Sequence, residues 1–250
     1  MDKYEHFIFF VDKISGNRAL FPKEEIAHAL SVLRMDSRGR LQATDGRGNI
    51  YECAIAPESA VTGEVQIVTS RAIPRLAPEL YVFIALPDRD AFESVVTDLS
   101  AMGAAKIVPV VSRYCQNAWW ERWEKHAGRL KRKMIAGIKQ SHNPWLPDMP
   151  GPVLFTCALT ELGAFDNRHC IVAEQSGVPL NSIRAVLPDV AKVACIIGPP
   201  GGFSQEETDC FKSNGFVFVN IAPYRLRTEL AAVVLCGNII QAQTEQNSRH

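Results

Sequence analysis

A glycine- and proline-rich loop follows a fully apolar run and is typical of a ligand-binding turn. The apolar run Val193–Ile197 leads into Gly-Pro-Pro-Gly-Gly-Phe at 198–203, and Ser204 comes directly after it. Ser204 and Glu207 have capping-box spacing, which predicts a helix that begins at once. The adjacent glycines let backbone approach a ligand without an obstructing Cβ, and the prolines stiffen the turn.

This loop would lie at the carboxyl end of a parallel strand, where α/β proteins bind ligands. The segment contains no Gly-x-Gly-x-x-Gly pattern, and no Lys-Ser or Lys-Thr pair follows it, so it is neither a dinucleotide fingerprint nor a P-loop. An ordinary strand-to-helix turn is the alternative interpretation. The spacing of the loop alone does not separate the two.

A second polar stretch precedes the last apolar helix of the chain. Arg225 and Arg227 flank one leucine, and Thr228-Glu229 opens the helix. Glu229 suits a first helical turn because the helix dipole favours a carboxylate there. Arg227 is disfavoured at the same place and needs another partner, such as a phosphate, a carboxylate or a developing oxyanion.

The elements that position these stretches alternate between strand and helix from residue 80 onward. This alternation predicts a mostly parallel sheet with helices on both faces. Predicted strands are 81–86, 107–111, 153–157, 170–173, 193–197 and 216–221, and predicted helices are 90–103, 118–141, 204–214 and 228–242.

The first 70 residues differ and predict a β-rich domain. Short apolar runs at 7–11, 51–55 and 64–68 are separated by Asp-Gly and Thr-Gly turn signals, and one helix begins near Pro22 with Ile26, Leu30 and Leu33 at helical spacing. Pro74 and Pro78 bracket a linker. We therefore expect domains at 1–73 and 74–250.

The composition indicates an ordinary globular protein with no net charge. Among 250 residues, 27 Lys and Arg balance 27 Asp and Glu, so any nucleic-acid surface must be a local patch. No apolar stretch is long enough for a membrane helix, and the N-terminus lacks a signal-peptide pattern. The seven scattered cysteines include no Cys-x-x-Cys pair, which favours reduced thiols, a cytoplasmic location and no metal site.

Taken together, the two polar stretches resemble one family. Gly-Pro-x-Gly-Gly-Phe-Ser with Glu206-Glu207, then a strand, then Leu-Arg-Thr-Glu at 226–229 is similar to the RsmE family of ribosomal RNA methyltransferases. The likeness extends to His28, to Val-Leu-Arg-Met at 32–35 and to the turn before Tyr51. It covers most of the chain and is weakest around 113–170.

The resemblance implies a SPOUT-type parallel sheet with a C-terminal trefoil knot, preceded by a small PUA-like domain that binds RNA. It implies S-adenosyl-L-methionine as cofactor, a homodimer, and methylation of uridine N3 in 16S RNA of the small ribosomal subunit. Arg227 and Glu229 would be catalytic, with Arg227 stabilising the uridine anion. The implied cofactor-binding residues are Ala173, Glu174, Ile197, Gly198, Pro199, Gly201, Gly202, Ile221, Ala222, Pro223, Leu226 and Thr228.

Two basic clusters are candidates for the RNA surface. Arg122, Lys125, Arg129 and Arg132 recur at helical spacing along 118–141, and the first domain carries a second cluster of Arg34, Arg38, Arg40 and Arg47. Each cluster is either a solvated face or a surface that follows phosphates. We expect RNA contacts from Arg34, Arg38, Arg40, Arg129 and Arg132, together with Gln140 and His142.

Several positions depart from the family pattern and remove positive charge or alter the loops. Pro200 replaces a residue that is usually acidic, Ala222 and Leu230 replace small residues, and His142-Asn143 replaces a pair of arginines. These departures motivate the alternative of a catalytically weakened homologue that binds ribosomal RNA as an assembly factor. A small-molecule α/β enzyme is a further alternative, against which the basic helix and the β-rich domain both argue.

Overall fold

The computed structural model divides the chain into two compact units. One comprises residues 1–75 and 135–146, and the other comprises 76–134 and 147–250. The structure describes residues 8–11, 13–23, 25, 26, 29, 39–115, 118–182 and 190–247, with side chains described to 242. The predicted boundary at 73 and 74 stays a prediction. The helix expected around Leu30 and Leu33 lies outside the described residues.

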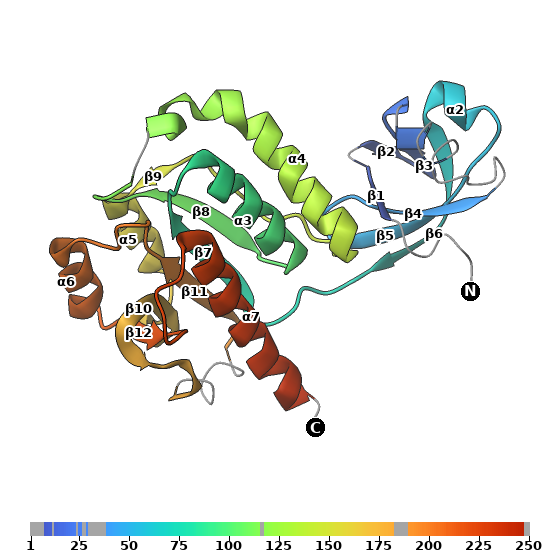
Figure 1. Ribbon diagram of the computed structural model, residues 1–250. Helices are drawn as coiled ribbons and strands as arrows, with labels where there is room; N and C mark the ends of the chain where they lie inside the picture. The colour runs from blue at the N-terminus through green and yellow to red at the C-terminus, as the bar shows by residue number, and fades with distance from the viewer. Residues whose placement is uncertain are drawn as a thin grey trace. The chain divides into compact units, whose positions relative to one another are not determined.

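The first unit contains a six-stranded sheet (Figure 1). Its strand order is β1-β4-β5-β6-β3-β2, with β1 and β4 parallel and the other pairs antiparallel. Alternate residues of the sheet, among them Phe9, Leu41 and Cys53, point into one apolar core. The prediction of a β-rich first part is confirmed. The elements are β1 (Ile8–Phe10), β2 (Lys13–Ser15), β3 (Arg18–Leu20), β4 (Arg40–Thr44), β5 (Asn49–Ala54), α2 (Ser59–Thr62) and β6 (Glu64–Ala72).

Residues 135–146 join this unit through the turn between β4 and β5. The indole of Trp145 lies so close to Gly48 that a Cβ there would overlap the ring. Gly48 donates a hydrogen bond of 2.9 Å to the carbonyl oxygen of Pro144, and Leu146 donates one to Gly46. The Asp45-Gly46 turn signal was therefore also a packing site, which no local pattern could indicate.

The second unit is built on a six-stranded sheet in which every pair is parallel (Figure 1). The strand order is β12-β10-β11-β7-β8-β9, so β11 lies between β10 and β7. This confirms the predicted α/β fold with a parallel sheet. The strands are β7 (Glu79–Ala85), β8 (Lys106–Val111), β9 (Val153–Leu154), β10 (Cys170–Pro179), β11 (Lys192–Ile197) and β12 (Val217–Asn220).

Helices cover both faces of this sheet. Phe83, Val108 and Ile196 pack with α5 and α6 on one face, while α7 lies on β7 and β11 on the opposite face, beside α3. Both faces are buried, which explains why β7 and β11 read as continuous apolar runs. The helices are α3 (Arg89–Ala101), η1 (Ala118–Arg122), α4 (Trp123–Ser141), α5 (Phe155–Leu162), η2 (Asn167–His169), η3 (Leu180–Ser182), α6 (Gln205–Ser213) and α7 (Thr228–Asn247).

Two predicted elements were partly wrong. The strand expected at 153–157 ends at Leu154, and α5 begins at Phe155 because this face of the helix buries Ala158 and Leu162 against the sheet. The helix expected at 118–141 opens with a 3-10 segment, in which the Trp119 indole donates to the carbonyl oxygen of Pro87. All seven cysteines are free thiols. No helix in the described part of the chain has the length and apolar character needed to span a bilayer.

Candidate ligand-binding site

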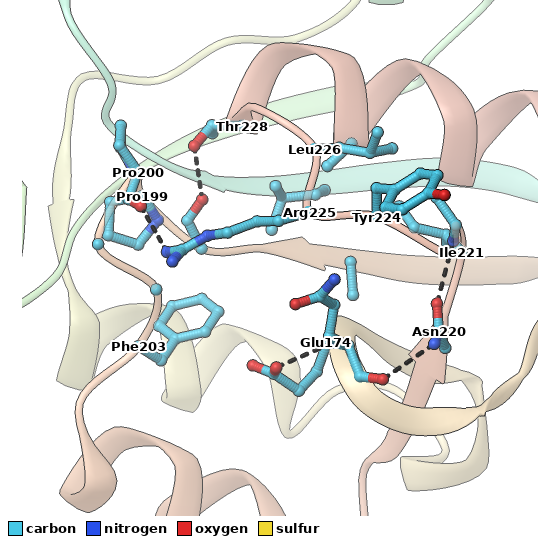
Figure 2. Close-up of a pocket in the computed structure, with 18 residues that line it drawn as sticks. Glu174, Pro199, Pro200, Phe203, Asn220, Ile221, Tyr224, Arg225, Leu226 and Thr228 are labelled. Carbon is cyan, nitrogen blue, oxygen red and sulfur yellow. Dashed lines mark hydrogen bonds between the residues drawn. The ribbon is translucent and has the colours of Figure 1, made fainter.

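A pocket of about 270 Å³ lies at one edge of the parallel sheet of the second unit (Figure 2). The segments that follow β11 and β12 form it, together with the first residues of α7 and the middle of β10. Because the strands are parallel, their carboxyl ends meet at this edge. In β10 the pairing with β12 shifts between Ala173 and Val178, which bends the strand where it borders the pocket.

Eleven of the twelve predicted cofactor-binding residues line this pocket. They are Ala173, Glu174, Ile197, Gly198, Pro199, Gly201, Gly202, Ile221, Ala222, Leu226 and Thr228. The remaining one, Pro223, is not among the lining residues. The other lining residues are Gln175, Pro200, Phe203, Asn220, Tyr224, Arg225 and Ala231.

The loop at 198–203 is held by the predicted capping box. Ser204 Oγ accepts from the Glu207 N–H at 3.2 Å, and Glu207 Oε2 accepts from the Ser204 N–H at 2.8 Å. Gly202 has φ 78, a conformation that disfavours a side chain, and donates to the carbonyl oxygen of Pro199 at 2.8 Å. The loop therefore turns sharply and presents its backbone to the pocket.

Two further hydrogen bonds connect this loop to the segment that opens α7. The buried Thr228 hydroxyl donates to the carbonyl oxygen of Gly198 at 2.9 Å. The Arg225 guanidinium donates to the carbonyl oxygen of Pro200 at 2.7 Å, and Figure 2 shows its side chain extending toward the loop. The two stretches selected from the sequence thus meet in one site.

The side of the pocket formed by β10 and the end of β12 carries further polar groups. The Asn220 side chain donates to the carbonyl oxygen of Gln175 at 2.9 Å and accepts from the Ala222 N–H at 3.1 Å (Figure 2). Glu174 and Arg225 are the charged side chains of the pocket lining. The site therefore combines an apolar wall with one carboxylate, one guanidinium and exposed backbone groups, as small-molecule sites do.

The two residues predicted to be catalytic lie outside the pocket lining. Arg227 and Glu229 form an ion pair, with Nε and Oε1 3.1 Å apart, and the Arg227 side chain is 83% exposed whereas that of Glu229 is 18% exposed. Glu229 is thus the partner that a cation at this helix start requires. The pocket arginine is Arg225, which the spacing of two arginines around one leucine could not distinguish from Arg227.

The predicted RNA-binding residues fall in both units. Arg40 pairs with Glu52 at 3.6 Å, and Arg129 pairs with the buried Glu93 at 2.8 Å. Arg132 is exposed, as is Gln140, and His142 has a left-handed backbone with φ 57. Arg34 and Arg38 lie outside the described residues. The RNA contacts of all these residues stay a prediction.

Among the side chains that the structure describes, no three potential metal ligands lie together.

The sheet and pocket define an α/β protein with a pocket at the carboxyl edge of its strands. Residues 75–240 match the RNA methyltransferase domain family, and the chain belongs to that family.

One curated relative is the ribosomal RNA small subunit methyltransferase E of Aquifex aeolicus. It is 25% identical over 234 residues, which cover 90% of this chain and 95% of the relative.

Two solved structures share the fold. The ribosomal RNA small subunit methyltransferase E of Neisseria gonorrhoeae, bound to S-adenosyl methionine, is 18% identical with a TM-score of 0.81 and covers 95% of this chain and 98% of its own. A putative methyltransferase of Legionella pneumophila in complex with the same cofactor is 22% identical, with a TM-score of 0.78. The match covers 94% of this chain and 97% of the Legionella chain.

Proposed function

We propose that this protein transfers a methyl group from S-adenosylmethionine to N3 of a uridine in 16S RNA of the small ribosomal subunit. The observation that carries the proposal is the pocket at the carboxyl edge of β11 and β12, in a chain of the RNA methyltransferase domain family. The name of the Aquifex relative supports the small-subunit RNA as substrate.

The pocket residues fit the cofactor. Adenine requires an apolar slot, which Ile197, Ile221 and Leu226 offer, and the backbone at 198–202 can approach the cofactor closely. Glu174 offers a carboxylate to hydroxyl or ammonium groups. When bound there, S-adenosylmethionine supplies a methyl group activated by its sulfonium sulfur.

The protein must expose and hold the uridine for this reaction. N3 lies on the Watson–Crick edge, so the base has to leave its pair or stack at a cost of a few kcal/mol. N3 must then release its proton to water before it can accept the methyl group that the cofactor would supply. Arg227 stabilises the resulting uridine anion in this proposal, and Glu229 orients its guanidinium across the 3.1 Å pair.

The finer features of the fold belong to the same proposal. We propose a trefoil knot in which α7 closes over the loop after β11, supported by the bond from Thr228 to Gly198. We propose that the first unit is a PUA-like RNA-binding domain, supported by its β-rich sheet. A cytoplasmic homodimer completes the proposal, since the substrate is a ribosomal particle.

One experiment tests the reaction. Purified protein is incubated with labelled S-adenosylmethionine and small subunits from a strain that lacks the modification, and the labelled nucleotide is mapped. A single N3-methylated uridine in 16S RNA is the expected result. Cofactor and subunit binding without transfer would instead support the weakened assembly factor that Pro200 and His142 suggest. Methylation of another molecule would contradict both.

A further inference from the structure

The loop after β8 is fastened to the pocket loop although the two strands are not neighbours. The Glu207 carboxylate accepts from the Arg113 N–H through Oε1 at 2.8 Å and from the Ser204 N–H through Oε2 at 2.8 Å. Glu207 is only 7% exposed. A buried carboxylate that accepts two backbone N–H groups is a strong restraint, because charge-assisted hydrogen bonds are about twice as strong as neutral ones.

The loop at 112–115 is also fixed internally. The Ser112 N–H donates to Cys115 Sγ at 3.3 Å, and the Cys115 N–H donates to the carbonyl oxygen of Ser112 at 3.2 Å. The Cys115 thiol donates to the carbonyl oxygen of Val110 at 3.5 Å. With the Glu207 bond, these contacts hold the backbone that carries Arg113 and Tyr114 in one conformation.

Tyr114 lies directly against the pocket loop. A Cβ at Gly201 would be 3.0 Å from Tyr114 Cβ and 3.5 Å from the first ring carbon, so a side chain at this position would crowd Tyr114. Tyr114 is nevertheless 48% exposed. The neighbouring Arg113 is exposed and forms no ion pair with any residue that the structure describes. An exposed aromatic residue therefore lies beside Gly201 of the pocket lining, and an exposed cation precedes it in the chain.

We propose that Arg113 and Tyr114 form the RNA-facing lip of this site and that Glu207 is its positioning residue. The Tyr114 ring stacks on a base at the target nucleotide, and the Arg113 guanidinium contacts a phosphate. An unstacked base needs such a platform, and proteins use aromatic and arginine side chains for it. This inference rests on the proposed function, since it assigns the RNA side of the same pocket.

The direct test measures binding to small subunits by filter retention, without methyl transfer. Tyr114→Ala should weaken binding about 5- to 150-fold, the range for one base stacked on an aromatic side chain. Tyr114→Phe keeps the ring and should bind like the unaltered protein. Arg113→Gln should weaken binding and flatten its salt dependence by about one phosphate. Cofactor affinity, measured by calorimetry, should stay within about twofold in all three.

Glu207 is tested with a matched pair of variants. Glu207→Gln replaces one acceptor oxygen by an NH2 group, so one of the two N–H donors loses its partner. Ser204→Ala removes the other half of the capping box but leaves the bond to Arg113. Both should lower thermal stability. Only Glu207→Gln should raise KM for small subunits, by about tenfold, with kcat at saturating subunits changed less.

The outcomes separate the inference from the proposed function. If Tyr114→Ala and Arg113→Gln bind small subunits as well as the unaltered protein does, Arg113 and Tyr114 do not face the RNA. This conclusion would hold even if the unaltered protein methylates its RNA. Weaker binding in Tyr114→Ala with a changed oligomeric state by light scattering would assign Tyr114 to a protein contact and also overturn the inference. Equal KM effects of Glu207→Gln and Ser204→Ala would show that Glu207 only caps α6. The variants could bind small subunits more weakly while the unaltered protein transfers no methyl group. That result would support the RNA-facing role of Arg113 and Tyr114 and contradict the proposed reaction.

Discussion

The hydroxyl of Thr228, at the start of α7, donates a hydrogen bond of 2.9 Å to the carbonyl oxygen of Gly198, directly after β11. Thr228 is 4% exposed, so water cannot easily replace this bond. The two segments are thirty residues apart in the chain, and the pocket lies between them. This buried bond therefore helps to fix their relative position, together with the bond from Arg225 to the carbonyl oxygen of Pro200.

Thr228→Val is expected to weaken both the fold and the pocket. Valine has nearly the same shape but cannot donate, so the Gly198 carbonyl loses its partner, which costs about 1–3 kcal/mol for a buried group. Denaturant unfolding should show this loss, and calorimetry should show weaker binding of S-adenosylmethionine. Thr228→Ser keeps the hydroxyl and is the control. Equal cofactor affinity in the valine variant would show that the bond does not shape the pocket.

Gly201→Val is expected to abolish cofactor binding while the protein stays folded. A Cβ at this position already meets Tyr114 Cβ at 3.0 Å, so the branched side chain must displace the loop or fill the pocket. Gly151→Val is the matched control in the same unit, because its Cβ would meet Trp123 at an ordinary 3.7 Å. Circular dichroism should be unchanged in both variants. If Gly201→Val binds S-adenosylmethionine with unaltered affinity, the loop at 198–203 does not form part of the cofactor site.

Local signals in the sequence predicted the turn at 198–203 and the helix start after it, whereas the family resemblance was needed to assign the loop to a cofactor site. The pattern of Ser204 and Glu207 acts over three residues, and both of its hydrogen bonds are present in the structure. Arg225 could not be separated from Arg227 in this way. Which of two arginines around one leucine faces the pocket depends on how the segment from β12 to α7 crosses the sheet edge, and this is a tertiary property.

Long-range pairings could not be predicted either. The bond from Glu207 to Arg113 joins residues 94 positions apart, and Trp145 contacts Gly48 across a similar distance. No periodicity in the chain reports such partners. Likewise, Phe155 begins a helix although its neighbours read as a strand, because packing of Ala158 and Leu162 outweighs β propensity.

Arg227→Ala is expected to reduce turnover about 100- to 1000-fold, as the loss of one oxyanion donor does, with little change in cofactor affinity. The measurement is single-turnover methyl transfer beside calorimetry. Glu229→Gln leaves the guanidinium in place and removes only its ion-pair partner. We expect a smaller loss in that variant. Near-normal turnover in Arg227→Ala would make the pair with Glu229 purely structural.

The stability of the protein is expected to fall above pH 9. Burial raises the pKa of the Cys53 thiol from 9.0 to about 12, so the folded state keeps a proton that the unfolded state releases. This contribution is fully present below pH 9 and is lost as the pH rises toward 12, by at most about 1.4 kcal/mol per pH unit. Denaturant unfolding between pH 8 and 10.5 measures the slope. Cys53→Ala should flatten it, and an equal slope would assign the effect to other groups.

The two exposed arginines of α4 are expected to act differently in RNA binding. Arg132 is exposed, and Arg132→Gln should weaken binding to small subunits and flatten the salt slope by about one unit. Arg129 pairs with Glu93, whose side chain is only 5% exposed. Its loss leaves a buried carboxylate poorly compensated, which costs about 1–3 kcal/mol or more of unfolding free energy.

Arg129→Gln should therefore lower the unfolding free energy, and Arg132→Gln should not. The double variant tests whether α4 follows phosphates, with an expected change in salt slope of one to two units. Combining Arg129→Gln with Glu93→Gln removes the buried charge and should restore part of the stability, which separates packing from RNA contact. Cofactor affinity should stay constant because these residues do not line the pocket. An unchanged salt slope in the double variant would show that this face of α4 is only solvated, and the phosphate contacts would then belong to other cations of the chain.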